Sequence, residues 1–165
     1  MHIFAVVVYL GGSLFLHLSL RRAMRLIPPG QASIVGAEVG KDFTVMSWLS
    51  LAAWGSTGYW MLFRYGWSDQ GAPLTLFIDP VMLELNRGRG LLVMTASWYL
   101  LVVSAAIITF VLRPRLATRL RPDADSALVE RATERLVGAA GWIDRLAIVN
   151  LLLAVIGFLA GVLYR

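Results

Sequence analysis

The chain has 165 residues, of which 58% are hydrophobic, and its mean hydropathy is +0.71. A soluble domain of this size could not bury so many apolar side chains, so the composition excludes an ordinary water-soluble protein and favours a membrane protein. Because the sequence contains no cysteine, disulfides, thiolate metal sites and thiol redox chemistry are also excluded. The net charge of +5 gives no indication of nucleic acid as a partner.

Four segments are each about 20 mostly apolar residues long, the length that crosses a bilayer as a helix. They are 1–20, 44–63, 91–112 and 142–164. None shows the alternating pattern of a barrel strand, and in lipid a helix satisfies its own backbone hydrogen bonds. The fold is therefore predicted to be all-α, a four-helix membrane bundle forming a single transmembrane domain over residues 1–165. Basic residues follow the first segment rather than precede it, so we expect that segment to remain as a helix and not to be removed as a signal peptide.

The basic residues predict the orientation of this bundle. The first and third loops (21–43 and 113–141) together hold ten Lys and Arg residues, whereas the second loop (64–90) holds three. Short cytoplasmic loops carry the excess of positive charge, so both termini and the second loop are expected outside. This arrangement fits a multi-pass protein of the bacterial cytoplasmic (inner) membrane. Membrane lipids, including anionic headgroups, are its expected surroundings.

Two loops carry structure of their own. Apolar residues recur at helical spacing between residues 126 and 137, with charged residues on the other face. We therefore expect an interfacial amphipathic helix before the fourth span, running into that span with a bend at Gly138 or Gly141. The second loop is expected to form a shallow lid over the outer end of the bundle.

Small residues that let helices approach closely are frequent in the four segments. The main examples are Gly11, Gly12, Gly55, Gly58 and the Gly157-x-x-x-Gly161 pair. They predict a tightly packed bundle.

The only two histidines, His2 and His17, both lie on the first helix. Fifteen residues at 1.5 Å rise separate them by about 22 Å along the axis, so they cannot bind one metal ion together. Each could face the bundle at a different membrane level as a separate axial ligand, or one could be a ligand and the other structural. Solvated or hydrogen-bonded interfacial histidines are the alternative. Met1 is next to His2, but the methionines form no regular ladder of copper ligands.

Other polar residues of the spans have simpler interpretations. Asp144 and Arg145 fall in the first turn of the fourth span, where an acid suits the helix N-terminus. Asn150 could form a hydrogen bond across helices. The sequence contains no carboxylate pair, no nucleophile with a base and no glycine-rich phosphate loop, so hydrolase and transferase chemistry has no recognisable constellation.

Residues 2–16 begin with a histidine, carry the aromatic Tyr9 seven positions later and the glycine Gly12 three positions after that. This helix resembles the opening helix of the copper resistance protein D-like membrane superfamily, which includes the HemJ-type protoporphyrinogen oxidases. The resemblance implies a b-type heme held by His2, or copper handling as in the copper-resistance branch. HemJ-type proteins carry a lysine in the third helix that their activity needs, whereas residues 91–112 contain no ionisable residue, which argues against that oxidase activity.

Three functions stay open at this point. The first is a heme b-binding protein with an electron-transfer or accessory role, acting as a homo-oligomer or within a larger membrane redox complex. The second is a non-catalytic structural subunit or assembly factor, and the third is copper uptake or tolerance. The residues expected to contact a cofactor are His2, His17, Tyr9 and Gly12, and those expected to bind a metal are His2, His17 and Met1.

Overall fold

The computed structural model describes residues 1–64, 84–116 and 126–163, and throughout these ranges the secondary structure is helical, with no strand. The first helical stretch consists of α1 (His2–Leu14), the π-helical η1 (Phe15–Leu20) and α2 (Arg21–Met24). It is followed by α3 (Pro29–Arg64), by the stretch of α5 (Asn86–Ala106), π-helical η3 (Ile107–Leu112) and α6 (Arg113–Leu116), and by α7 (Ser126–Leu163). The prediction of an all-α fold is confirmed. Most of the predicted outer lid lies outside the described residues.

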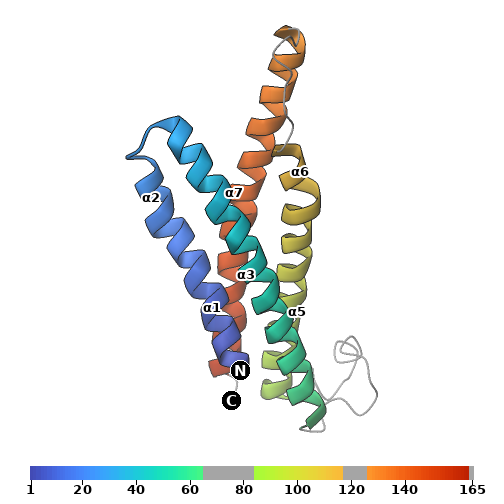
Figure 1. The fold of residues 1–165 in the computed structure, drawn as a ribbon. Coiled ribbons are helices and arrows are strands. Elements are labelled where there is room, and N and C mark those ends of the chain that lie inside the picture. The colour runs from blue at the N-terminus through green and yellow to red at the C-terminus, as the bar shows by residue number, and fades with distance from the viewer. Residues whose placement is uncertain (65–83, 117–125, 164–165) are drawn as a thin grey trace.

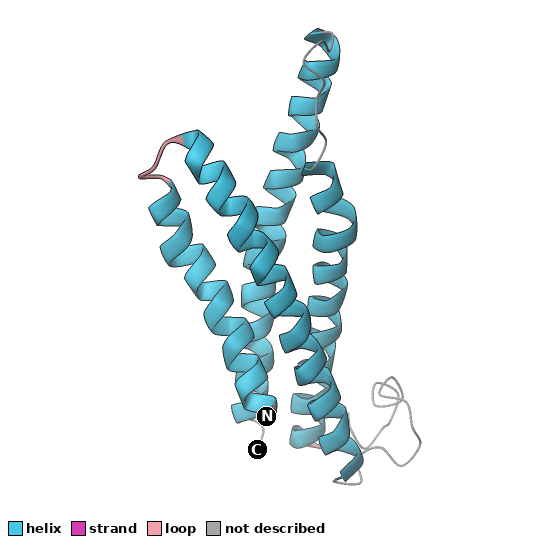
Figure 2. Cartoon of the chain, in the orientation of Figure 1, coloured by secondary structure: helices cyan, strands magenta, loops and turns pink. Residues whose placement is uncertain are grey.

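The four long stretches run side by side and alternate in direction (Figure 1). The start of α1 and the end of α7 lie at the same end of the molecule, and the turn from α2 to α3 lies at the other (Figure 2). α1 packs mainly against α3, and α5 packs mainly against α7. The connections between neighbouring stretches therefore place successive helices antiparallel.

Three of the stretches are long and apolar enough to cross a membrane: His2–Met24, Asn86–Arg115 and Val137–Leu163. They contain most or all of the predicted spans 1–20, 91–112 and 142–164. The remaining predicted span, 44–63, lies within α3. This helix is long enough to cross a membrane, but its hydropathy is lower than that of the other three stretches, because serine, threonine, glycine and tryptophan interrupt its apolar sequence. The chain is thus compatible with a multi-pass membrane protein on the basis of three helices.

The amphipathic segment predicted before the last span is helical, and α7 contains both the segment and the span. It runs without interruption from Ser126 through Gly138 and Gly141 to Leu163. Its first turns extend past the ends of the neighbouring helices (Figure 1). The two expected elements are therefore one helix.

The packed core is small and lies along the centre of the bundle. Its most buried large side chains are Leu51 of α3 and Leu101 of α5, with Ala154 of α7 fully buried beside them. Many large apolar side chains remain on the outside, for example Phe4 and Phe110, which are 69% and 70% exposed. Such a surface suits lipid rather than water, because soluble proteins rarely expose extended apolar patches.

Glycines bring helices together at several of the predicted places. A Cβ on Gly55 would overlap the Trp98 ring, and one on Gly12 would overlap the end of the Met46 side chain. On α7, a Cβ on Gly161 would lie 3.0 Å from the Met94 sulfur. Gly11 has no atom within 4 Å of such a Cβ, so of this glycine pair only Gly12 serves the close contact.

Candidate functional site

Two cavities lie at opposite ends of the bundle, and each is lined by one of the two histidines. The cavity at the end where the chain begins has a volume of about 420 Å³ and is lined by His2. The other has a volume of about 520 Å³ and is lined by His17. We call them the His2 cavity and the His17 cavity. Both volumes fall in the range of small-molecule sites, roughly 300–1,000 Å³.

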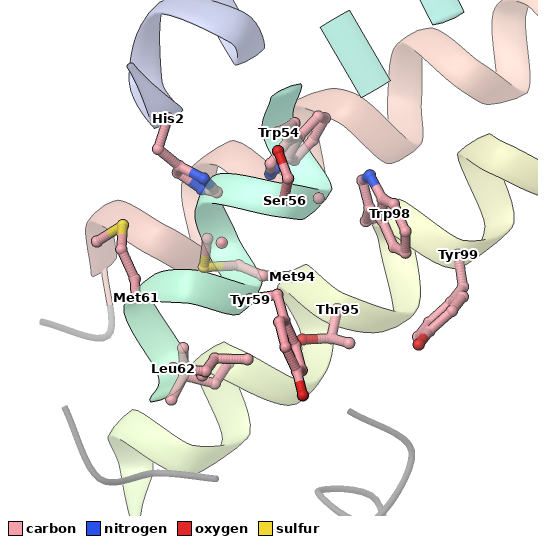
Figure 3. A pocket seen from close by; sticks show the side chains of 13 residues that line it. His2, Trp54, Ser56, Tyr59, Met61, Leu62, Met94, Thr95, Trp98 and Tyr99 are labelled. Atoms are coloured by element: carbon pink, nitrogen blue, oxygen red, sulfur yellow. The ribbon is translucent and has the colours of Figure 1, made fainter. Parts of the chain in front are cut away.

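His2 begins α1 and points toward α3, where a glycine leaves room for its ring (Figure 3). A Cβ on Gly58 would lie 3.0 Å from Cε1 of the His2 imidazole. The ring also lies edge-on to Trp54, with centroids 6.4 Å apart and planes at 82°. Any side chain at residue 58 would therefore press on the imidazole.

The Thr57 hydroxyl contacts one ring nitrogen of His2. Nδ1 lies 3.1 Å from the hydroxyl oxygen of Thr57. That oxygen also lies within hydrogen-bond distance of the backbone carbonyl oxygens of Ala53 and Trp54, and its one proton can point to either of them. In the tautomer in which Nδ1 carries the proton, Nδ1–H donates to the Thr57 hydroxyl oxygen and Nε2 keeps a free lone pair. This is the arrangement in which metal-binding histidines are oriented by a second hydrogen bond.

The rest of the His2 cavity is mostly apolar and aromatic, with Ser56 and Thr95 also in its lining. Aromatic rings from α3 and α5, including Tyr59 and Trp98, line it together with the thioethers of Met61 and Met94 (Figure 3). Trp98 is fixed because its Nε1 donates a 2.9 Å hydrogen bond to the carbonyl oxygen of Leu51. The cavity thus combines one imidazole, two sulfur atoms and flat apolar walls.

The His17 cavity is more polar. Nε2 of His17, Oγ of Ser47 and Oδ1 of Asn150 are buried and have no hydrogen-bond partner in the described part of the protein. Arg113 also lines this cavity, and its guanidinium donates to the carbonyl oxygen of Gly40 on α3. Asn150 therefore does not form the interhelical hydrogen bond through Oδ1 that its position suggested.

The other residues of the recognised first-helix pattern lie away from His2. Tyr9 is 3% exposed and lines the His17 cavity rather than the His2 cavity. Gly12 lies at the contact of α1 with Phe43 and Met46 of α3. Met1 is 96% exposed. None of the other residues expected at a site, His17, Tyr9, Gly12 and Met1, lines the His2 cavity. Tyr9 and His17 line the other cavity together.

The charged pair at the start of the last predicted span joins two helices. Arg21 Nη2 of α2 and Asp144 Oδ2 of α7 are 2.7 Å apart at the end of the bundle that holds the His17 cavity. Arg145 lies over the Trp142 ring at 5.3 Å. These contacts agree with the interface role predicted for Asp144 and Arg145.

Several residues of the two cavities carry no signal in the sequence. Thr57, Ser47 and Trp98 are ordinary residues of apolar helices until the fold brings them to a histidine or into a cavity. Ser47 and Thr57 are polar residues of the predicted span 44–63, but nothing in the sequence distinguishes them from the other serines and threonines of that span. Within residues 1–64, 84–116 and 126–163, no three or more His, Cys, Asp or Glu side chains are grouped to hold a metal ion.

Comparison of the chain with protein-family models, with curated proteins and with solved structures finds no match. The resemblance of the first helix to the copper resistance protein D-like superfamily stays an expectation from residues 2–16, and the two cavities are the evidence on function.

Proposed function

We propose that the protein binds a b-type heme in the His2 cavity and serves in electron transfer, alone or as part of a larger membrane redox complex. The observation that carries this proposal is the His2 imidazole beside the Thr57 hydroxyl, because its Nδ1–H tautomer donates to that oxygen and has an Nε2 lone pair at a mostly apolar cavity. A bound heme would supply one-electron chemistry, with its potential set by the axial ligands and the polarity around it.

The residues of the cavity fit such a group. Nε2 of His2 would be the axial ligand, and Gly58 keeps the space beside the ring open. Met61 and Met94 offer thioethers, which serve as axial ligands in some b- and c-type hemes, and the ring of Trp98 provides a flat wall. Copper is favoured less, because Met1, the methionine that a copper site was expected to use together with His2, is exposed and does not line the cavity.

Membrane insertion of α3 as a fourth crossing belongs to the same proposal. Residues from Gly36 to Leu62 of α3 line the two cavities at opposite ends of the bundle, a distance of about 40 Å at 1.5 Å per residue. A helix that extends this far among three apolar helices crosses the same layer. Four crossings also agree with termini at one end, and the basic first and third loops favour an N-out, C-out orientation in a bacterial inner membrane.

The decisive experiment is a visible absorption spectrum of detergent-purified protein expressed with ample heme, recorded oxidised and then dithionite-reduced. We expect a Soret band and reduced α and β bands in the wild type. His2→Ala should lose them, whereas His17→Ala, which removes the histidine of the other cavity, should keep them. Loss in His17→Ala with retention in His2→Ala would move the heme to the other cavity and refute the assignment.

A second variant tests the orientation of the ligand. Thr57→Val keeps the volume of the side chain and removes the acceptor for His2 Nδ1–H. Since removal of such a supporting group costs roughly 10- to 100-fold in metal affinity, heme occupancy at limiting heme should fall while the spectrum of the bound fraction stays of b type. A featureless wild-type spectrum would reject the heme, and metal analysis of that sample would separate copper handling from a structural subunit.

A further inference from the structure

The His17 cavity has the properties of a second binding site. It lies between α1–η1, α3, η3 and α7, at the end of the bundle away from His2, and shares no lining residue with the His2 cavity. Its walls are mostly apolar, with the rings of Tyr9, Phe43 and Trp48 among them. A heme in the His2 cavity would not contact the residues that line the His17 cavity. The proposed heme therefore does not account for the second cavity.

Three unpartnered polar atoms from three helices meet at this cavity. They are Nε2 of His17 on η1, Oγ of Ser47 on α3 and Oδ1 of Asn150 on α7. Ser47 and Asn150 are each only 7% exposed. A buried polar atom without a partner is costly, and in a membrane no bulk water is present to compensate. The fourth unpartnered atom of the described residues, Oγ of Ser104, lies outside this cavity.

Both π-helical segments of the described chain border the same cavity. η1 contributes Leu16 and His17, and η3 contributes Ile108 and Thr109. π-Helical turns are rare and occur frequently at functional sites. The presence of both π-helical segments at one cavity is an observation separate from the unpartnered atoms. It also supports a binding site in the His17 cavity.

We propose that the His17 cavity binds the hydroxyl-bearing aromatic headgroup of a membrane quinol. Oδ1 of Asn150 can only accept, so the ligand must offer a donor, which a quinol hydroxyl does and a phosphate diester does not. Ser47 Oγ and His17 Nε2 can donate or accept, and they reach the cavity from two other helical elements, α3 and η1. The aromatic walls suit a flat ring, and a quinol is soluble in the bilayer that would surround the protein.

The competing ligand types fit less well. Among the described residues no carboxylate lines the cavity, so a bound cation would have no compensating charge. Arg113 is the one charged group in the described lining, and one of its five N–H donors is used by the carbonyl oxygen of Gly40. An anionic lipid headgroup would place acceptor oxygens against the acceptor of Asn150. A neutral ligand with donors satisfies the atoms that the protein leaves open.

The test is a thermal-unfolding shift in phosphatidylcholine nanodiscs with decylubiquinol as the probe, kept reduced under anaerobic conditions. A ligand that binds only the folded state raises the Tm with concentration. We expect decylubiquinol to raise the Tm of the wild type, and decylbenzene, which has the same tail without oxygens, to leave it unchanged. The readout requires no group in the His2 cavity, so this proposal and the heme proposal can fail separately.

Two variants distinguish binding from a structural role. Asn150→Leu removes the unpartnered acceptor, so the ligand-free protein should be at least as stable as the wild type while its affinity for decylubiquinol falls at least tenfold. Ser47→Ala, a smaller change, should weaken binding in the same direction. Ser104→Ala is the matched control, because it removes a similarly buried, unpartnered hydroxyl outside the cavity and should leave the ligand-induced shift intact.

Three results would overturn the proposal. They are an equal shift with decylbenzene, an undiminished decylubiquinol shift in Asn150→Leu, and a shift produced by phosphatidylglycerol but not by decylubiquinol. The last result would assign the cavity to an anionic lipid headgroup.

Discussion

The contact of Gly55 with the Trp98 ring controls the shape of the His2 cavity, and Gly55→Ala tests it. A Cβ at residue 55 would overlap two atoms of that ring and lie 3.0 Å from a third. The ring cannot simply move away, because its Nε1 donates to the carbonyl oxygen of Leu51. Overpacking of a core costs about 1–3 kcal/mol. Loss of the hydrogen bond adds about 1 kcal/mol, and the better helix propensity of alanine returns about 1 kcal/mol.

The free energy of unfolding should therefore fall by about 1–3 kcal/mol in Gly55→Ala. The assay is unfolding in detergent micelles by SDS titration, followed by far-UV circular dichroism. Gly11→Ala is the control, because a Cβ at residue 11 meets no atom within 4 Å, and that variant should be as stable as the wild type or more stable. Equal stability of the two variants would refute the packing of Trp98 on Gly55.

Three further predictions concern stability and topology. The Arg21–Asp144 pair has side chains 44% and 52% exposed, so a double-mutant cycle with alanine should give a coupling of less than about 1 kcal/mol, and a coupling of several kcal/mol would contradict its exposure. Ser104→Ala removes a buried hydroxyl that lacks a partner and should leave unfolding stability unchanged or raise it by about 1 kcal/mol, whereas a clear loss would mean that the hydroxyl is bonded in the membrane. Because the chain has no cysteine, Arg25→Cys and Arg87→Cys are clean probes of orientation: a membrane-impermeant maleimide added to intact cells should label only residue 87, and labelling of residue 25 instead would reverse the proposed topology.

The helical fold could be predicted because a chain that crosses lipid must satisfy all its backbone hydrogen bonds internally, which only helices and closed β-barrels do. The apolar run 91–112 and the described part of the run 142–164 fall inside helices that are long and apolar enough to cross a membrane. Helix ends were less predictable. α7 begins at Ser126 and runs into the fourth span, as the amphipathic pattern predicted, whereas α3 begins at Pro29, well before its predicted span 44–63.

The candidate site could be predicted only in part. The two histidines were evident because ionisable groups are rare in spans, and their separation on one helix already prevented a shared metal site. Which atoms meet each histidine depends on contacts between distant helices, as for His2 with Thr57, which are 55 positions apart in the sequence. The short pattern of His2, Tyr9 and Gly12 suggested one site, whereas helical geometry distributes these residues over different places along the bundle.

The composition of α3 follows from its position between the two cavities. This helix falls below the hydropathy of the other three stretches, and the residues responsible include Ser47 at the His17 cavity and Gly55, Thr57 and Gly58 around His2. Larger apolar residues at these positions would raise the hydropathy of α3. They would also remove a polar atom from a cavity or from His2, or fill the space that a glycine leaves for an aromatic ring or the imidazole. On the proposal that α3 is a fourth crossing, its low hydropathy is explained by the small and polar residues that line the two cavities or contact His2.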